Sequence, residues 1–567
     1  MFDEKPKLFK LPQKGEVLGE DPMHINDLPL KKVPDYMRRR GGIWYWTGAL
    51  ITMAFVYQVI TGLLLLLYYV PSDAYNSTEA IITSVPYGSL ILTTHLYGAY
   101  AMIFLIYVHL FRNYFFGSYK KPRQLQWVLG VLLLALTIGV GFFGYSMTGD
   151  VLSSDATDVG RGIAKATPFL GNYLESIFFG NGTSTSLFSH MLAWHIILVA
   201  LIGIVFGAHF WLAEANGIMP SHRETNHKAP AMDKNEEKHK EWYPYNFSFM
   251  TQLAMFAFGF IILIPSILSL LAPVSPGPAS TFPALFSPFP QVSPSSPNAA
   301  YVPAYPPWFL LFVYKAVDFD IFAAAGNLSA LAATAVIGVI PLLYFLLLPF
   351  IDTTDDLHPL SRPLVTSFGI LGIIYMAILS AWGALSPGVQ IPNYEVFAVL
   401  LPPFVVVVGG MTFLSRQYKK GKFKITGTKI LTSFLLFLFV MMFGAYVFGQ
   451  NFTATLAHAS LLNLVATFFT GGVMVFGAVG TAKSARLSNN YESTKQKQER
   501  SAYRMNKNTA VVLSALLAIA AIVITYLIFS LNPIGAINNG EFGIGLAFIL
   551  IIAGTIMRIY RAAFYYE

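Results

Sequence analysis

Two stretches of equal length decide the fold: residues 95–109 read HLYGAYAMIFLIYVH, and residues 195–209 read HIILVALIGIVFGAH. Each begins and ends with a histidine and carries no Asp, Glu, Lys or Arg between them. A separation of 14 residues is close to four turns of an α-helix, so both histidines of a stretch face the same way, roughly 21 Å apart at ~1.5 Å per residue. Histidine inside an apolar helix is costly and usually has a function.

The composition indicates a polytopic membrane protein. Of the 567 residues, 55% are hydrophobic and 12% are charged. The chain has no cysteine, which excludes disulfides, iron–sulfur clusters and thiolate metal sites within it. We interpret the net charge of +8 as loop charge on the cytoplasmic side, and we expect no nucleic-acid binding, because no soluble basic domain is present.

The hydropathy pattern predicts an all-α membrane protein with twelve spans, since about 20 apolar residues cross a bilayer. The expected spans are 43–69, 87–115, 125–147, 189–213, 248–271, 322–350, 364–385, 394–414, 428–449, 457–480, 508–531 and 542–560. Lys and Arg gather in alternate loops, which predicts that both termini are cytoplasmic.

The second and fourth spans then run in the same direction, so their histidines fall on two levels. His95 lies level with His195 near the outer face, and His109 with His209 near the inner face. Two facing histidines can supply both axial ligands of a haem iron, which predicts a four-helix bundle holding two haems. The first and third spans contribute glycines with the same 14-residue spacing, where a flat group can approach the backbone. These glycines are Gly48, Gly62, Gly130 and Gly144.

At this point the sequence resembles the cytochrome b family of bc complexes over about residues 35–415. The motifs that carry the resemblance are HLYGA at 95–99, HLFR at 109–112, GSYK at 117–120, Gly144-Tyr145 and Arg362-Pro363. We expect an archaeal member of this family with extra helices at its C-terminus. The resemblance implies a multi-pass protein of the plasma membrane that acts in a respiratory chain.

The family also implies partners, cofactors and site residues. Quinol is oxidised near the outer face, one electron passing to a Rieske iron–sulfur partner and the other crossing the membrane through the two haems. Bis-histidine ligation suits b-type haems and a-type haems alike. By resemblance Arg112 pairs with a haem propionate, and His190, which replaces an arginine of the family, is a further propionate contact. The outer quinol site corresponds to Tyr145, Pro306, Trp308 and Phe309.

Several family residues are replaced. The Pro-Glu-Trp-Tyr motif of the outer site reads Pro-Pro-Trp-Phe at 306–309, so the glutamate that would take a quinol proton is missing. Alternative proton acceptors nearby are Asp150, Asp155, Asp158, Asp318 and Asp320. At the inner quinone site, a histidine of the family corresponds to Glu214 and an aspartate to Met250, which leaves an inner quinone-reducing site in doubt.

We divide the chain into a cytoplasmic segment 1–42, the di-haem bundle 43–240, a second part 241–415 and a membrane extension 416–567. The second part holds the uncharged, proline-rich loop 272–320 of the quinol site. Three alternatives remain open: the di-haem subunit of a quinol oxidase supercomplex with a haem–copper oxidase partner, a twelve-helix secondary transporter, and the catalytic subunit of a haem–copper oxidase. The transporter would show internal repeats, and the oxidase three further histidines for copper.

Overall fold

The computed structural model describes residues 24–27, 46–217, 219, 228–230, 245–274, 282–421, 429–457, 463, 465–475, 477 and 505–565. Within these ranges the chain is helical, and its extended contacts are two isolated bridges, Lys228 with Asp356 and Phe319 with Ile391. The prediction of an all-α membrane protein is confirmed.

Ten spans in the described ranges are long and apolar enough to cross a membrane: Thr47–Leu66, Gly88–Phe116, Gln124–Ser146, Ser184–Asn216, Asn246–Leu271, Gly326–Ile351, Pro363–Leu385, Asn393–Lys419, Lys507–Phe529 and Ala536–Phe564. Each overlaps one of the predicted spans. Of the other two, 428–449 falls on α16 (Lys429–Ala457). The span 457–480 lies partly outside the described residues, with an apolar helix over Val465–Val475. The total of twelve, and the side on which the termini lie, stay predictions.

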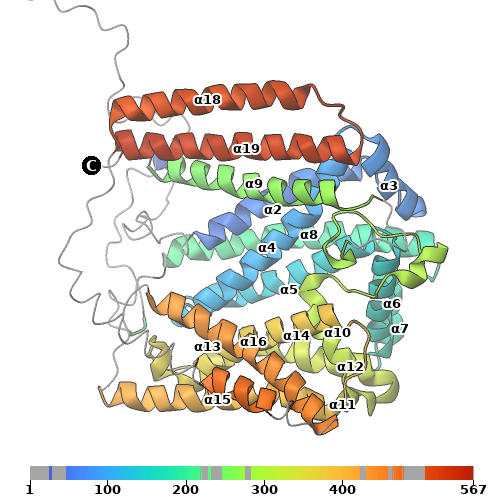
Figure 1. Cartoon of the computed structure of the whole chain (residues 1–567), viewed down its shortest axis with the longest axis vertical. Coiled ribbons are helices and arrows are strands. Elements are labelled where there is room, and N and C mark those ends of the chain that lie inside the picture. The colour runs from blue at the N-terminus through green and yellow to red at the C-terminus, as the bar shows by residue number, and fades with distance from the viewer. Residues whose placement is uncertain are drawn as a thin grey trace, which may run out of the picture.

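Four helices form the bundle that carries the histidine stretches (Figure 1). They are α2 (Thr47–Leu66), α4 (Gly88–Phe116), α5 (Gln124–Ser146) and α8 (Ser184–Asn216). Helix α2 packs on α4, and α5 packs on α8. Many of their apolar side chains are exposed, as lipid-facing helices require.

Short helices cover one end of this bundle, which we name the outer end because its loops are those predicted to lie outside. These are α3 (Ala74–Ser84), α6 (Val151–Ala166) and α7 (Gly171–Phe179), and α6 and α7 run across the bundle axis (Figure 1). Asp150 caps the N-terminus of α6, its Oδ1 accepting a hydrogen bond from Ser153 N at 2.9 Å. The carboxylate thereby satisfies one of the free N–H groups of the first turn.

The proline-rich loop packs on the start of α6 in its described part, 282–320. Gln291 N donates to Asp150 Oδ2 at 2.6 Å, and Val151 N donates to Val292 O at 2.9 Å. Phe289 and Val292 are buried. This part of the loop is therefore packed against the outer end, unlike an extended linker.

The second half of the chain forms its own helical layer beside the bundle (Figure 1). It comprises α10 (Leu311–Val317), α11 (Asp320–Ala323), α12 (Ser329–Thr334), η8 (Ala335–Val339), α13 (Ile340–Ile351), α14 (Pro363–Leu385), α15 (Asn393–Lys419) and α16. Helix α9 (Tyr245–Leu271) lies on the other side of the bundle, against α2 and α4 (Figure 1). Short 3-10 turns connect these helices: η4 (Ala284–Phe286), η5 (Pro297–Tyr301), η6 (Trp308–Leu310), η7 (Gly326–Leu328) and η9 (Pro359–Ser361). Buried Trp382, Ile374 and Val399 lie at the centre of the largest apolar cluster, between α14, α15 and α16.

The predicted C-terminal extension contributes to two separate faces (Figure 1). Helix α16 lies beside α14 and α15, whereas α18 (Lys507–Phe529) and α19 (Ala536–Tyr560) lie against α9. Asn539 Oδ1 accepts from Leu90 N of α4 at 3.2 Å, and Arg561 Nη1 donates to Ser248 Oγ of α9 at 3.1 Å. The boundary at residue 416 stays a prediction.

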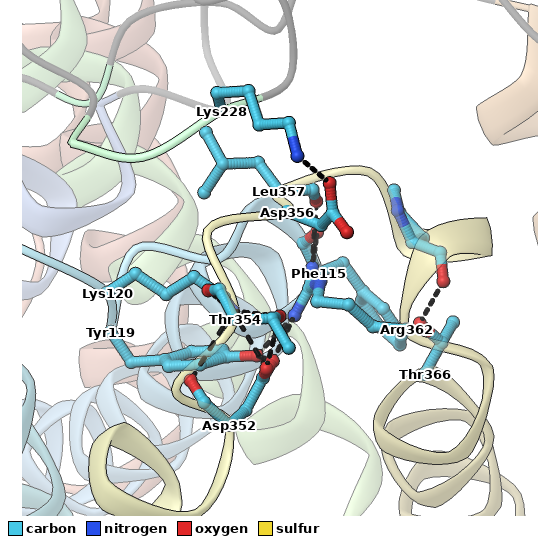
Figure 2. Close-up of polar contacts among 11 residues, drawn as sticks. Phe115, Tyr119, Lys120, Lys228, Asp352, Thr354, Asp356, Leu357, Arg362 and Thr366 are labelled. Atoms are coloured by element: carbon cyan, nitrogen blue, oxygen red, sulfur yellow. Dashed lines mark hydrogen bonds and ion pairs between the residues drawn. The ribbon is translucent and has the colours of Figure 1, made fainter.

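A buried ionic cluster joins the bundle to the second half at the opposite end (Figure 2). Lys120 Nζ lies 2.8 Å from Asp352 Oδ1, and Tyr119 donates to Asp352 Oδ2 at 2.5 Å. Arg362 Nη1 lies 3.4 Å from the same Oδ2, and Thr354 Oγ1 donates to Oδ1 at 2.8 Å. Tyr119 and Lys120 belong to the GSYK motif and Arg362 directly precedes α14, so residues from two motif segments meet at one carboxylate.

Candidate functional site

Each of the four histidines at 14-residue spacing packs on one of the four predicted glycines. A Cβ built on Gly62 would lie 3.2 Å from His95 Cε1, and one on Gly144 would lie 2.8 Å from His195 Cε1. At the other level, the corresponding distances are 3.5 Å from Gly48 to His109 Cε1 and 3.1 Å from Gly130 to His209 Cε1. In the structure the glycines thus leave room for the histidine rings themselves, where we had expected the cofactor.

A second set of contacts orients the rings. Thr61 Oγ1 lies 2.8 Å from His95 Nδ1 and donates its own proton to Tyr57 O. It therefore accepts from His95, and Thr47 Oγ1 lies at the same distance, 2.8 Å, from His109 Nδ1. An imidazole that carries its proton on Nδ1 has its lone pair on Nε2. This tautomer can bind a metal through Nε2.

The two histidines of α8 use backbone carbonyls in the same way. His195 Nδ1 donates to Val140 O at 3.0 Å, and His209 Nδ1 donates to Gln126 O at 2.9 Å. A carbonyl oxygen only accepts, so the proton is on Nδ1 in both rings. Val140 and Gln126 are again 14 residues apart on α5, as Thr47 and Thr61 are on α2. The sequence analysis missed these orienting groups, although the 14-residue period could have found them.

The distance between the outer rings fits two axial ligands of one metal. The ring centres of His95 and His195 lie 6.4 Å apart, with the ring planes at 62°. With metal–nitrogen bonds of about 2 Å and ring centres roughly 1 Å behind each nitrogen, two imidazoles on one iron have centres on the order of 6 Å apart. The residues present therefore fit a haem held between α4 and α8.

Two polar side chains of α4, Arg112 and Asn113, lie next to His109 at the inner level. Asn113 Nδ2 donates to His109 Nε2 at 3.0 Å, and Arg112 Nη1 donates to Asn113 Oδ1 at 2.7 Å. The Arg112 guanidinium also lies 4.5 Å from the ring centre of Phe116. Arg112 therefore lies within one turn of the His109 ring.

His190 lies apart from the four facing rings. Its Nδ1 lies 2.7 Å from Ser186 O of the same helix, and the ring packs on Gly180, whose added Cβ would lie 3.0 Å from His190 Nδ1. That His190 is no ligand of the iron between His95 and His195 stays a prediction. Contact with a propionate stays a prediction.

The Pro-Pro-Trp-Phe segment lies against α4 and α5 near the outer histidines. Phe309 is buried, and its ring would lie 3.0 Å from a Cβ on Gly141. The Trp308 ring lies 6.0 Å from that of Tyr100, edge to face. Tyr145 donates to Tyr305 O at 3.3 Å. Tyr145 directly follows Gly144, so this segment meets α5 at the level of the His195 contact.

A cavity of ≈ 170 Å³, here called the outer cavity, opens on the other side of the segment. Its walls come from α6, from residues 304–318 and from the end of α14. The lining residues used below are Asp155, Pro306, Tyr314, Lys315, Asp318 and Gly383. Of the predicted quinol-site residues, Pro306 lines the cavity, whereas Tyr145, Trp308 and Phe309 are not part of its lining.

The structure separates the five candidate proton acceptors. Asp155 and Asp318 line the outer cavity, whereas Asp158 and Asp320 lie outside its lining. Asp150 is 5% exposed and is committed to capping α6 and holding Gln291. Asp155 is exposed at the cavity wall, and partial desolvation there raises its pKa, with a further contribution from the Asp158 and Asp150 carboxylates. Burial also raises the pKa of Asp318, and the Lys315 ammonium partly offsets this.

The two replaced residues of the inner quinone site lie on different helices. Glu214 is half-buried near the end of α8. Met250 lies on α9 and packs with Trp46 and Leu253.

The sequence was compared with protein-family models and with known proteins, and both comparisons give cytochrome b proteins. Residues 100–284 match a family model described as cytochrome b(N-terminal)/b6/petB. A cytochrome b of Sulfolobus acidocaldarius is 42% identical over 416 residues, 70% of each chain. A cytochrome b subunit of a cytochrome bc complex from Chlorobaculum thiosulfatiphilum is 31% identical over 357 residues, 62% of this chain and 76% of its own.

A solved structure shares the fold. A chain of a hyperthermophilic respiratory Complex III superposes with a TM-score of 0.50 and 23% identity, covering 71% of this chain and 99% of its own. The similarity to the Sulfolobus cytochrome b, 42% identity over 70% of both chains, is high enough to establish the family. The chain therefore belongs to the cytochrome b family of bc-type respiratory complexes.

Proposed function

We propose that the chain binds two haems, the outer one between His95 and His195 and the inner one between His109 and His209, and carries electrons from quinol across the membrane. The observation that carries the proposal is the repeated contact set. At both levels a histidine of α4 meets a glycine and a threonine of α2, and a histidine of α8 meets a glycine and a carbonyl of α5.

A cytochrome b of a prokaryotic respiratory complex is a multi-pass protein of the plasma membrane, and quinol-linked electron transfer follows from the family. Membership of this family sets aside the transporter and the haem–copper catalytic subunit. Haem b is the cofactor that the family implies. When bound, it would supply one-electron transfer.

The chain's own residues hold and tune this cofactor. The four Nε2 atoms are the proposed ligands. At His109 the bound haem would take the place of Asn113, whose Nδ2 lies 3.0 Å from Nε2 in this structure. The hydrogen bonds at Nδ1 fix the tautomer and raise the basicity of each imidazole. Arg112 and His190 are our candidates for the haem propionates, Arg112 at the inner level and His190 at the outer end.

The separation of the two histidine levels along the helix axis supports electron transfer across the membrane. Fourteen residues correspond to roughly 21 Å along the helix axis, at ~1.5 Å per residue. An electron that moves between two such levels crosses much of the hydrocarbon layer. Moving one charge across the full potential is worth about 2.3 kcal/mol per 100 mV, which a respiratory complex can store.

We assign the entry of electrons to the outer end. The segment 306–309 lies beside α5 at the level of the His195 contact, and its first residue, Pro306, also lines the outer cavity. The chain has no cysteine, so a thiolate-held iron–sulfur centre must be on a partner. A Rieske protein is the partner expected in a bc-type complex. The replaced residues of the outer site keep a haem–copper oxidase as an alternative partner.

A pyridine haemochrome assay with redox titration tests the proposal. The purified chain should contain two b-type haems per polypeptide with two midpoint potentials, and a short-chain quinol should reduce them. One haem or none would refute the pairing, and two haems that no quinol reduces would refute the proposed electron source.

A further inference from the structure

Lys315 and Asp318 form an ion pair in the wall of the outer cavity. Lys315 Nζ lies 3.1 Å from Asp318 Oδ2 and donates to Ser386 O and Val389 O, both at 2.9 Å. The Lys315 side chain is 0% exposed and that of Asp318 is 20% exposed. An ammonium group has three N–H donors, and all three are used. The ammonium is therefore held in place and fixes one oxygen of Asp318.

The backbone of Asp318 is held as well. Its N–H donates to Lys315 O at 3.2 Å, and its carbonyl accepts from Ile391 N at 2.8 Å. The residue is thus fixed between α10 and the 386–391 segment that follows α14. Its second carboxylate oxygen, Oδ1, makes no hydrogen bond within the part of the chain that the structure describes, so this oxygen is left for a ligand.

The other ionisable groups around the cavity are placed differently. Asp155 belongs to α6, which forms the opposite wall of the cavity. It is exposed and has no ion pair among the described residues. Tyr314 donates its hydroxyl proton to Ala156 O at 3.0 Å. Asp318 is therefore the cavity carboxylate that is both partly buried and held in one position. A held, partly desolvated carboxylate is suited to act as a base.

The cavity has the size of one six-membered ring. Its volume is ≈ 170 Å³, and an engineered protein cavity of about 150 Å³ binds benzene. Tyr305 and Pro306 form part of the wall, and Tyr305 O accepts the hydrogen bond of Tyr145, next to Gly144 and the His195 ring. A ring in this cavity therefore lies beside the segment that contacts the outer haem level.

We propose that Asp318 accepts the proton of a quinol hydroxyl in the outer cavity and that Lys315 acts as its positioning residue. The inference rests on the proposed oxidation of quinol. In this step the quinol O–H bond breaks, a new O–H bond forms at Asp318 Oδ1, and the electron pair stays on the quinol oxygen, so no oxidant is needed. The electrons leave afterwards to the iron–sulfur partner and the outer haem, and Asp318 releases its proton to outside water. Asp318 thereby replaces the glutamate that is missing from 306–309.

The test compares Asp318→Asn with the control Asp158→Asn in the complete complex, using a decyl-substituted benzoquinol. Asp158 is exposed on α6 and lies outside the cavity lining. Asparagine keeps an acceptor for Lys315 but takes no proton. We expect Asp318→Asn to slow quinol-driven haem reduction about 10²-fold, within the range of general-base catalysis. KM should change little, and the dithionite-reduced spectrum should match the wild type. Asp158→Asn should behave as the wild type.

The pH profile gives a second readout. In the wild type the rate should fall as pH decreases through the pKa of Asp318, because the carboxylic acid cannot accept a proton, and Asp318→Asn should lose this limb. An unchanged rate and profile in Asp318→Asn, or the same loss in Asp158→Asn, would overturn the inference. If Asp318→Asn does not assemble, Asp318→Glu should retain the acidic limb at a reduced rate, and a profile without that limb overturns the inference. Failure of the wild-type haems to accept electrons from quinol would instead refute the proposed function.

Discussion

Gly144 and His195 are in direct contact, and no side chain fits between them. A Cβ on Gly144 would lie 2.8 Å from His195 Cε1 and 3.0 Å from its Nδ1, closer than an ordinary van der Waals contact. The His195 ring is also held by the carbonyl of Val140, so it cannot turn away without losing that hydrogen bond. The glycine thus determines where the ring stands.

The first prediction is a graded effect of Gly→Ala substitution. The added methyl group should disturb the histidine most at Gly144, less at Gly130 and Gly62, and least at Gly48, where the distance is 3.5 Å. The loss of the haem absorbance per polypeptide, measured by pyridine haemochrome, should follow this order. Gly203→Ala on α8 is the control, because a Cβ there meets nothing within 4 Å. Equal haem content in all four variants would show that the glycines serve general helix packing and do not position the histidine rings.

The second prediction separates ligands from neighbours. His95→Ala should remove one of two haems and leave the inner one, because His195 alone cannot complete its axial pair. His190→Ala should keep both haems, since its ring packs on Gly180 and bonds Ser186 O. Haem counting with redox titration checks both variants. A one-haem His190→Ala protein would show that the ligand assignment on α8 is wrong.

The sequence predicts the histidine and glycine set because spacing along a straight helix becomes spacing in space. The same period repeats in Thr47 and Thr61, which were missed because hydroxyl residues occur on many helix faces. The i,i+3 spacing of Lys315 and Asp318 is visible in the sequence. The burial of Lys315 could not be predicted, because its ammonium is held by carbonyls more than 70 residues away, as the Val389 contact shows. Nor could the docking of α19 on α9, because membrane helices are apolar on several faces and give little sign of their neighbours.

The third prediction concerns Thr61, whose hydroxyl accepts the Nδ1 proton of His95 at 2.8 Å. Thr61→Val keeps the shape and removes the acceptor, so the imidazole becomes a weaker donor to iron and the outer midpoint potential should rise. Each tenfold difference in affinity between the two oxidation states corresponds to about 59 mV. Thr52→Val is the matched control on α2, because the Thr52 hydroxyl donates to Gly48 O instead of a histidine. Equal potentials in both variants would contradict an orienting role for Thr61.

The last prediction addresses the buried cluster at Asp352 (Figure 2). Burial alone would raise the pKa of Asp352, but hydrogen bonds from Lys120, Tyr119 and Thr354 outweigh it and hold the pKa below its ordinary value. A carboxyl group with a lowered folded-state pKa contributes stability that is present above its unfolded pKa of about 3.9 and is lost as pH falls through the folded value. Thermal unfolding in detergent should therefore show a loss of stability below about pH 4 that Asp352→Asn lacks.

At neutral pH, Asp352→Ala leaves Lys120 and Arg362 buried without their shared carboxylate, which should cost about 3–5 kcal/mol. Asp356→Ala is the matched control four residues on, since Asp356 pairs with Lys228 at 2.6 Å while the Lys228 side chain is 63% exposed. Such a surface pair is worth about 0–1 kcal/mol. The Asp352 variant should thus unfold at a clearly lower temperature than the Asp356 variant. Similar unfolding temperatures would show that the cluster does not hold α4, α13 and α14 together.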